Sequence, residues 1–545
     1  MTEKFEMVAK TFQGLEGVLA DELRALGADE VTEGRRMVSF KGDKEMMYRA
    51  NFCLRTALRV LKPIHKFKSS DADDLYRKVK EFDWEQIMSV DSTFSIDATV
   101  FSDSFRHSRF VTYRVKDAIV DYFNEKCGKR PSIRLNAPDM RFNVHISDHD
   151  VTISLDSSGE PLYKRGWRTA QTDAPINEVL AAGIIKLSGW DGQSNFVDPM
   201  CGSGTFLVEA ALIAANINPG VFRQDFAFQH WADYDADLYD SIYNDDSQER
   251  DFNFKIYGSD IAVQAVAIAR ANVKSAGVAK YVEVEQKPIQ DYNALPAEGK
   301  GVLITNPPYG ERLKLDDIEA LYATIGEKLK RVFRGYDAWV IASDENLIDQ
   351  IGLKPSVKYP LLNGDIPCEL REYVIFDGAY NDLRRAGGSI KNEGFRRSED
   401  KRKPYRRRDG EDRGDRDERR PFKRGFRRDG EDRGDRDERR PFKRGFRRDG
   451  EDRPAAGSFR SPKPYSERGR DDEGEQQTDA FWHTREFAKK ILRGRKPTLG
   501  VENERPIVHG RRNGWKRREL NDGFDGNSTD NNSNNDNNTN NDGEQ

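Results

Sequence analysis

Cysteine and histidine are scarce in this chain of 545 residues. Only four cysteines occur, Cys53, Cys127, Cys201 and Cys368, and none has the short spacing of a metal-binding pair. The chain also holds only seven histidines. This composition argues against a disulfide scaffold and against a zinc site, and it favours a reduced, cytoplasmic protein that uses no metal.

Long apolar runs are missing as well. No stretch approaches the roughly 20 consecutive apolar residues of a membrane-spanning helix, and the opening residues MTEKFEMVAKTF lack the apolar core of a signal peptide. We therefore expect no membrane partner. Large aliphatic residues become rare after about residue 385, so the net charge of −4 averages two different kinds of sequence and says little about partners.

Residues 385–545 are predicted to form a disordered, low-complexity tail. The 20-residue stretch RRDGEDRGDRDERRPFKRGF at 407–426 recurs unchanged at 427–446, and none of its faces is apolar enough for the copies to stack. Residues 401–453 hold 23 Lys and Arg against 15 Asp and Glu. Two interpretations remain open: an arm that binds RNA weakly, and a solubilising tail without a partner.

Two small α+β units are predicted at 1–56 and 57–157. Helical periodicity and strand alternation distinguish their elements. The first unit has expected strands near 5–10, 30–33 and 36–40 and a helix within 14–27; the second has strands near 57–66, 92–101 and 141–155 and helices within 71–84 and 109–128.

The pattern changes at about residue 158. Short apolar runs such as SNFVDP, FKIYGSD, YVEVEQ, GVLITNPP and DAWVIAS now alternate with longer helical segments. Strands of this kind are typical of a buried, mostly parallel sheet. We therefore expect a doubly wound α/β domain over 158–384, with an insertion at about 213–252 that is rich in aromatic and acidic residues.

A glycine turn follows the first of these strands. In FVDPMCGSGTFLVEAA (196–211) the strand ends at Asp198 and a helix begins near Thr205, with Gly202 and Gly204 in the turn. Glycines there let a ligand approach the backbone, next to free N–H groups at the helix start. The stretch lacks the third glycine of a dinucleotide motif and the lysine of a P-loop, so phosphate binding fits poorly.

Three further strand ends carry polar residues. Asp260 ends YGSD, where doubly wound domains place an acid that binds ribose hydroxyls, and Asp291 follows the next strand. The fourth strand runs into LITNPPYGERL (303–313), which contains Asn306. Each residue alone is compatible with an ordinary turn or a helix cap, but four successive strand ends on one sheet edge favour a ligand site.

These motifs resemble those of the THUMP-domain class I S-adenosylmethionine-dependent RNA methyltransferases. DPMCGSGTFLVE fits the glycine motif of that family, YKRGWRTAQTDAPINEVLAAGII (163–185) resembles the segment leading into its catalytic domain, and NPPYGERL resembles the form in the large-subunit rRNA guanine-N2-methyltransferases. The resemblance covers about 1–384. It implies a ferredoxin-like unit at 1–56, a THUMP RNA-binding domain at 57–157 and a class I methyltransferase domain at 158–384.

The resemblance also implies an activity. The fused form of that family carries a second methyltransferase domain, where this chain has the expected tail, so only methyl transfer to the exocyclic N2 amine of a guanosine in 23S rRNA is implied. Guanine-N2 methylation of tRNA is the alternative. Less favoured are a DNA adenine-N6 methyltransferase, because no DNA-reading domain is evident, and a catalytically idle RNA-binding assembly factor.

Residue roles follow from the same resemblance. Asn306 and the Pro307 carbonyl would accept hydrogen bonds from the amine, Pro308 would stiffen the elbow, and Tyr309 would stack on the extruded base. The positive sulfur of the cofactor already supplies the electrophile, so no metal is needed. The residues expected to bind S-adenosylmethionine are Asp198, Pro199, Gly202, Ser203, Gly204, Thr205, Asp260, Ile261, Asp291 and Asn306.

Several cations flank these motifs. Arg165, Arg168 and Arg312 are predicted to contact RNA phosphates near the catalytic mouth, and a solvated surface charge is the alternative for each. In FRHSRF, a weaker candidate patch on the second α+β unit consists of Arg106, His107 and Arg109.

Overall fold

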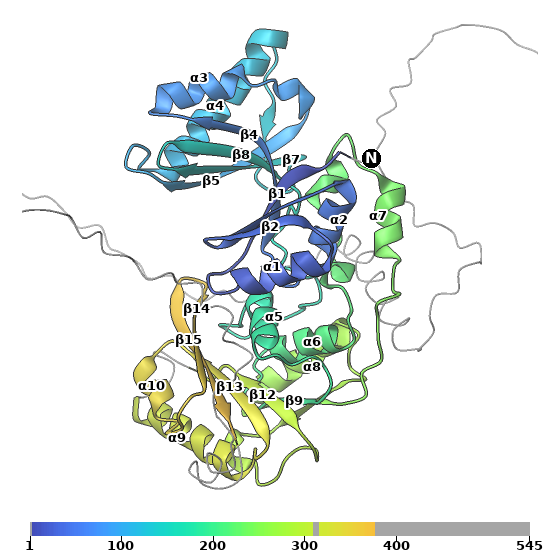
Figure 1. Cartoon of the computed structure of the whole chain (residues 1–545), viewed down its shortest axis with the longest axis vertical. Coiled ribbons are helices and arrows are strands. Elements are labelled where there is room, and N and C mark those ends of the chain that lie inside the picture. Colours follow the sequence, from blue (N-terminus) through green and yellow to red (C-terminus); the bar gives the residue numbers. More distant parts are fainter. Residues whose placement is uncertain (1–2, 309–314, 376–545) are drawn as a thin grey trace, which may run out of the picture. The chain divides into compact units, whose positions relative to one another are not determined.

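The computed structural model describes residues 3–308 and 315–375 (Figure 1). The expected tail from residue 385 onward lies outside the described residues, as do Tyr309 and Arg312. None of the helices in the described ranges has the length and apolarity to cross a bilayer.

The N-terminal part builds one eight-stranded sheet in the order β2-β3-β1-β4-β8-β7-β5-β6. Strand β4 pairs with β1 through Val8 and Leu61, and with β8 through Lys66 and Thr152. The predicted boundary at 56/57 therefore falls just before a strand that both α+β units share. The strands are β1 (Phe5–Lys10), β2 (Asp29–Gly34), β3 (Met37–Gly42), β4 (Arg59–Lys68), β5 (Thr93–Phe101), β6 (Ser132–Ile133), β7 (Met140–Ser147) and β8 (Asp150–Asp156).

Four helices accompany this sheet: α1 (Glu16–Ala25), α2 (Lys44–Cys53), α3 (Ala72–Glu81) and α4 (Ser108–Cys127). Helix α3 begins where Asp71 accepts hydrogen bonds from the next turn's backbone, and α4 ends at Gly128, whose φ of 66° suits glycine. Figure 1 shows α3 and α4 on one face of β4, β8 and β5. Buried Leu75 and Val79 explain how α3 is held there.

The second sheet has seven strands in the order β11-β10-β9-β12-β13-β15-β14. Strands β9 to β13 are parallel neighbours, whereas β15 runs antiparallel to β13 and β14. This confirms the expected doubly wound, mostly parallel α/β sheet. Its strands are β9 (Asn195–Asp198), β10 (Ile256–Asp260), β11 (Val282–Gln286), β12 (Gly301–Thr305), β13 (Tyr336–Ala342), β14 (Val357–Asn363) and β15 (Ile366–Val374).

The helices of this sheet are α5 (Glu178–Leu187), α6 (Thr205–Ala214), α8 (Val263–Ser275), α9 (Leu315–Arg331) and α10 (Glu345–Asp349). Every residue of α6 is buried, which explains its almost wholly apolar sequence. Helix α5 also meets α1, because a Cβ added at Gly183 would lie only 2.4 Å from Leu15 Cδ1. The two halves of the described chain therefore share apolar contacts as well as a covalent connection.

The aromatic insertion completes the core of the first sheet. It contains the 3-10 turns Pro219–Phe222 and Ala227–His230 and helix α7 (Ala236–Tyr243), which Figure 1 shows alongside α2. The ring of Phe228 stacks on Tyr48 of α2 with centroids 4.3 Å apart, and Tyr239 meets Phe52 edge-on. The insertion thus buries apolar surface of the N-terminal half.

Candidate functional site

The strand order of the second sheet brings the predicted polar residues to neighbouring strand ends. Strand β9 lies between β10 and β12, so Asp198, Asp260 and Asn306 follow or end three adjacent parallel strands. Asp291 ends the 3-10 turn Ile289–Asp291 that comes after β11, the next strand along. Ligands of doubly wound sheets bind at this edge, beyond the carboxyl ends of the strands.

The two glycines of the turn differ in the space beside them. Gly202 and Gly204 have φ values of 51° and 77°. A Cβ added at Gly204 would lie 3.1 Å from the Ala269 Cβ of α8, whereas the nearest atom to one at Gly202 is 3.8 Å away, in Thr172. Space for a ligand therefore opens at Gly202, while Gly204 lets the turn pack on the protein.

Asp260 fixes the glycine turn to strand β10. One carboxylate oxygen accepts from the Gly202 N–H at 3.0 Å, and the other accepts from the Ala262 N–H at 2.9 Å. Each carboxylate oxygen can accept more than one hydrogen bond, so the acid keeps capacity for hydroxyl donors. The next residue, Ile261, is 68% exposed and offers an apolar surface beside this acid.

Asp198 links the glycine turn to strand β12. Its Oδ1 accepts from the Thr305 hydroxyl at 2.9 Å and from the Met200 N–H at 3.2 Å. Burial raises the pKa of this carboxyl to about 7, while the Thr305 and Met200 hydrogen bonds lower it. The bond from Thr305 fixes the end of β12 immediately before Asn306.

The side-chain oxygen of Asn306 receives no hydrogen bond from residues 3–308 or 315–375. This Oδ1 atom is buried. Pro307, which follows, is buried. Leaving a buried acceptor unpaired costs about 1–3 kcal/mol. The arrangement is therefore ready to accept a hydrogen bond from an incoming N–H.

Two hydroxyls predicted to face the cofactor are engaged within the protein. Ser203 Oγ accepts from the Thr172 N–H at 2.8 Å, and Thr205 Oγ1 accepts from Arg168 at 2.8 Å. The Pro199 carbonyl accepts from Ser259 at 3.2 Å. What this turn can offer a ligand is therefore mainly its backbone.

Sequence reasoning missed Asn272, which joins the segment 169–172 to the glycine turn. Its Oδ1 accepts from the Thr169 N–H at 2.9 Å, and its Nδ2 donates to the carbonyls of Ala170 and Ser203, both at 2.9 Å. Asn272 is fully buried on α8. An amide in the apolar stripe that contains Ala269 and Val273 is the signal that identifies such a residue from sequence.

The prediction that Arg165 contacts RNA is wrong, because its side chain is only 2% exposed. The guanidinium donates to the carbonyls of Arg55 at 2.6 Å and Leu162 at 2.9 Å, and it pairs with Glu209 at 3.4 Å. Glu209 lies on α6, and Arg55 precedes β4. Arg165 therefore connects the two halves of the described chain.

Arg168 also departs from its predicted role. Its Nε donates to Glu178 at 2.7 Å and its Nη2 to the Thr205 hydroxyl at 2.8 Å, with 15% of the side chain exposed. The guanidinium is engaged inside the protein, which contradicts contact with an RNA phosphate. Because Thr205 begins α6, Arg168 supports the helix that follows the glycine turn.

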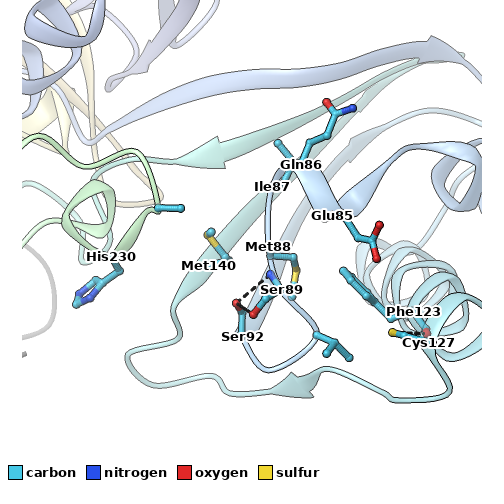
Figure 2. Close-up of a pocket in the computed structure, with 12 residues that line it drawn as sticks. Glu85, Gln86, Ile87, Met88, Ser89, Ser92, Phe123, Cys127, Met140 and His230 are labelled. Atoms are coloured by element: carbon cyan, nitrogen blue, oxygen red, sulfur yellow. Dashed lines mark hydrogen bonds between the residues drawn. The ribbon is translucent and has the colours of Figure 1, made fainter. Parts of the chain in front are cut away.

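A cavity of about 570 Å³ lies away from this sheet edge (Figure 2). Met88, Phe123 and Met140 supply apolar surface, and Glu85 and His230 lie at its sides. Both of these side chains have partners, since Glu85 pairs with Lys126 and His230 lies 3.4 Å from a carboxylate oxygen of Asp225. None of the predicted site residues lines this cavity, so we assign it no role in the chemistry. Across the described ranges, no cluster of three or more His, Cys, Asp or Glu is placed to hold a metal ion.

Three domain families match the chain in succession. They are described as the RlmL ferredoxin-like domain at 6–61, the THUMP domain at 69–156 and the RMKL-like methyltransferase domain at 165–372. These are the three folded parts that the sequence motifs imply.

Curated relatives carry related names. A ribosomal RNA large subunit methyltransferase K/L of Syntrophotalea carbinolica is 40% identical over 69% of this chain and 54% of that protein. The chain thus spans about half the length of such K/L relatives. A protein of Synechocystis that is provisionally named an RNA methyltransferase is 37% identical over 68% of this chain and 96% of that protein.

Solved structures show the same architecture. A protein provisionally described as a methyltransferase, in complex with SAH, is 31% identical, with a TM-score of 0.62 over 70% of this chain and all of that chain. A protein of Listeria monocytogenes described as a predicted N6-adenine-specific DNA methylase is also 31% identical, with a TM-score of 0.62 over 68% of this chain and 97% of that chain. The chain therefore belongs to the family of THUMP-containing RNA methyltransferases that have an RMKL-like methyltransferase domain.

Proposed function

We propose that the protein transfers a methyl group from S-adenosylmethionine to the exocyclic N2 amine of a guanosine in 23S rRNA. The observation that carries this proposal is the buried Oδ1 of Asn306 directly after β12, which has no hydrogen-bond partner in the part of the chain that the structure describes. The Asn-Pro-Pro sequence, the glycine turn after β9 and the names of the K/L relatives support it. RNA is the partner, and the cytoplasm is the expected compartment.

The residues at the sheet edge fit S-adenosylmethionine. The open side of Gly202 admits a ligand against the backbone, the Asp260 carboxylate can accept from ribose hydroxyls, and exposed Ile261 offers an apolar surface to a base. When bound, the cofactor supplies an electrophilic methyl group on a positive sulfur. The other proposed cofactor residues belong to the same turn and strand ends, and we propose that they surround the ligand mainly with their backbone. They are Asp198, Pro199, Ser203, Gly204, Thr205 and Asp291.

Asn306 supplies orientation rather than acid–base chemistry. An exocyclic amine is a weak nucleophile because its lone pair is delocalised into the ring. The amine can donate one hydrogen bond to Asn306 Oδ1 and another to the Pro307 carbonyl. These two bonds would turn the nitrogen lone pair toward the methyl group. Positioning of this kind contributes up to roughly 7–11 kcal/mol in favourable cases. The hydroxyl of Thr305, held by Asp198, keeps the Asn306 backbone in place. Pro308 and Tyr309 complete the proposed catalytic set.

Asn306→Ala should leave cofactor affinity nearly unchanged and lower kcat by at least about two orders of magnitude, because the lost contact forms mainly in the reacting geometry. Asn306→Asp should be milder, since a carboxylate still accepts. Asn244→Ala is the matched control, because Asn244 is exposed at the end of α7. Isothermal titration with S-adenosylmethionine and single-turnover methylation measure the two quantities. A large loss of cofactor affinity with normal turnover would contradict the role of Asn306.

Product identification tests the function itself. Unmodified 23S rRNA, tRNA and duplex DNA are each incubated with the protein and labelled S-adenosylmethionine, digested, and analysed for methylated nucleosides. N2-methylguanosine in 23S rRNA is the expected product. N2-methylguanosine in tRNA would change only the RNA class, whereas N6-methyladenine in DNA, the chemistry named for the Listeria protein, would overturn the proposal.

A further inference from the structure

The cavity of about 570 Å³ lies between the second α+β unit and the aromatic insertion (Figure 2). Apolar side chains from several elements converge on it: Met88, Phe123 and Met140 are at most 5% exposed, and Ile87 and Val90 are half-buried beside them. Its volume is in the range of roughly 300–1,000 Å³ that is usual for binding pockets. Methionine side chains adapt their shape to different partners. The cavity can therefore accept apolar side chains from another segment.

The polar groups around the cavity already have partners within the protein. The hydroxyls of Ser89 and Ser92 share a hydrogen bond of 3.1 Å, and the Cys127 thiol donates to the Phe123 carbonyl at 3.0 Å. The two charged residues at its sides are paired as described above. A small polar ligand would find few groups left to bind it, whereas an apolar surface needs no such groups.

Two of the chain stretches that line the cavity are acidic. Residues 82–105 contain five Asp and Glu and no Lys or Arg, and residues 224–249 contain eight Asp and Glu and no Lys or Arg. Asp91 of the lining loop is exposed and makes no ion pair within 3–308 and 315–375. On α4, Lys126 is already neutralised by Glu85. This charge repels phosphates and attracts cations, so the cavity favours a basic, apolar segment over a nucleic acid.

A segment of this kind occurs later in the same chain. The stretch DAFWHTREFAKKILR at 479–493, which lies outside the described residues, has the spacing of an amphipathic helix. Residues on the apolar side of the helical period are Phe481, Phe487, Ala488, Ile491 and Leu492, and cations on the other side are Arg485, Lys489, Lys490 and Arg493. About 100 residues separate this segment from residue 375, and each can span up to about 3.3–3.6 Å, so chain length does not prevent contact with the cavity.

We propose that residues 479–493 dock with their apolar side in this cavity of the same chain. An amphipathic helix laid in an apolar groove is a common mode of recognition, and its cations would meet the acidic stretches beside the cavity. Tethering raises the local concentration of the segment, so docking needs only modest affinity. The Arg-rich repeats at 407–446 would then belong to a loop that is held at both ends. The inference goes beyond the proposed function and does not depend on it, since neither RNA nor cofactor takes part.

Cys127 allows a direct test, because it lines the cavity and is exposed, whereas the other three cysteines are buried or half-buried. In the full chain, Ala488→Cys places a thiol on the apolar side of the segment. Mild oxidation without RNA or cofactor should join this thiol to Cys127 within one molecule, because a disulfide needs Cα atoms within about 7 Å of each other. Mass spectrometry of digested protein identifies the bond.

Glu486→Cys is the matched control for this disulfide, since Glu486 lies on the polar side of the same segment. Its bond to Cys127 should form more slowly than that of Ala488→Cys. The proposal would be overturned by the absence of a bond between Cys127 and the thiol at position 488, or by an equal rate in the control. Bonds that form only between two molecules would also overturn it, because the proposed contact lies within one chain.

Alkylation of Cys127 tests the contact without an added thiol. Phe487→Asp with Ile491→Asp leaves residues 3–308 and 315–375 unchanged and should weaken docking by at least about 10-fold, because two buried apolar side chains are lost. Iodoacetamide should then modify Cys127 several-fold faster than in the wild type. Gln476→Asp with Gln477→Asp adds the same charge just before the segment and should keep the wild-type rate. Equal rates in the wild type and the first variant, or the same acceleration in the control, would refute docking.

Discussion

Replacement of Arg165 by alanine should destabilise the protein strongly and leave RNA affinity unchanged. The substitution removes the cation that pairs with Glu209, which is 0% exposed, and the donor for the carbonyls of Arg55 and Leu162. Removing one member of a buried ion pair costs about 3–5 kcal/mol, because the other charge remains without compensation. The loss should therefore consume a large share of the 5–15 kcal/mol typical of a folded domain.

The pH dependence of this loss identifies Glu209 as its cause. Burial already raises the pKa of Glu209, and the charge of Arg165 opposes that rise. Without Arg165, the folded-state pKa should rise further above the unfolded value. A carboxyl with a raised pKa in the folded state favours folding when protonated, so the deficit of Arg165→Ala should shrink as pH falls from alkaline to mildly acidic.

Urea unfolding followed by tryptophan fluorescence measures the free energy, and RNA binding is measured in parallel. A double variant, Arg165→Met with Glu209→Leu, should regain part of the lost stability, because no charge stays buried. If Arg165→Ala instead kept wild-type stability and bound RNA more weakly, the buried position of this side chain would be refuted and a phosphate contact would be restored as its explanation.

Three further outcomes follow from the sheet edge. The folded-state pKa of Asp198 is raised to about 7, so the wild-type protein loses stability as this carboxyl ionises. Thermal scans without cofactor should therefore show the unfolding midpoint of the wild type falling relative to that of Asp198→Asn as pH rises from about 4 through about 7. Gly204→Ala should lower stability more than Gly202→Ala, since only Gly204 packs closely on α8, whereas Gly202→Ala should weaken S-adenosylmethionine binding more, because the ligand space opens at Gly202; thermal scans and calorimetry compare the two variants. Asn272→Ala should raise KM for S-adenosylmethionine several-fold at nearly constant kcat and constant KM for RNA, because Asn272 holds the turn but does not face the amine; a fall in kcat alone would contradict this.

Much of the fold and the candidate site follows from local sequence patterns. The strand ending at Asp198, the helix beginning at Thr205 and the polar strand ends at Asp260 and Asn306 agree with the structure, because buried parallel strands leave continuous apolar runs. Strand β14 is absent from the sequence-based expectation. It alternates weakly and contains Pro360, which belongs in edge strands, and β14 is indeed at the edge of the sheet.

Two of the features that sequence patterns missed depend on long-range contacts. In the sequence, Arg165 looks like a surface cation, because its partners Glu209 and the Arg55 carbonyl come close only in the folded chain. The aromatic insertion has no local reason for its composition, because Phe228 finds its partner Tyr48 far earlier in the chain. Local sequence patterns cannot identify partners that are so far apart in the chain. Asn272 is different, because a lone amide on an apolar helix face is visible in the helical periodicity.

Strand β4 decides how the N-terminal half can be divided. Since β4 hydrogen-bonds to β1 on one side and to β8 on the other, a fragment that stops at residue 56 would leave one edge of β1 without a partner. Unpaired edges of this kind recruit strands from other molecules. A fragment that begins after residue 68 would leave β8 equally bare. A stable fragment of the N-terminal half should therefore contain the ferredoxin-like and THUMP units together, even though they match two separate domain families.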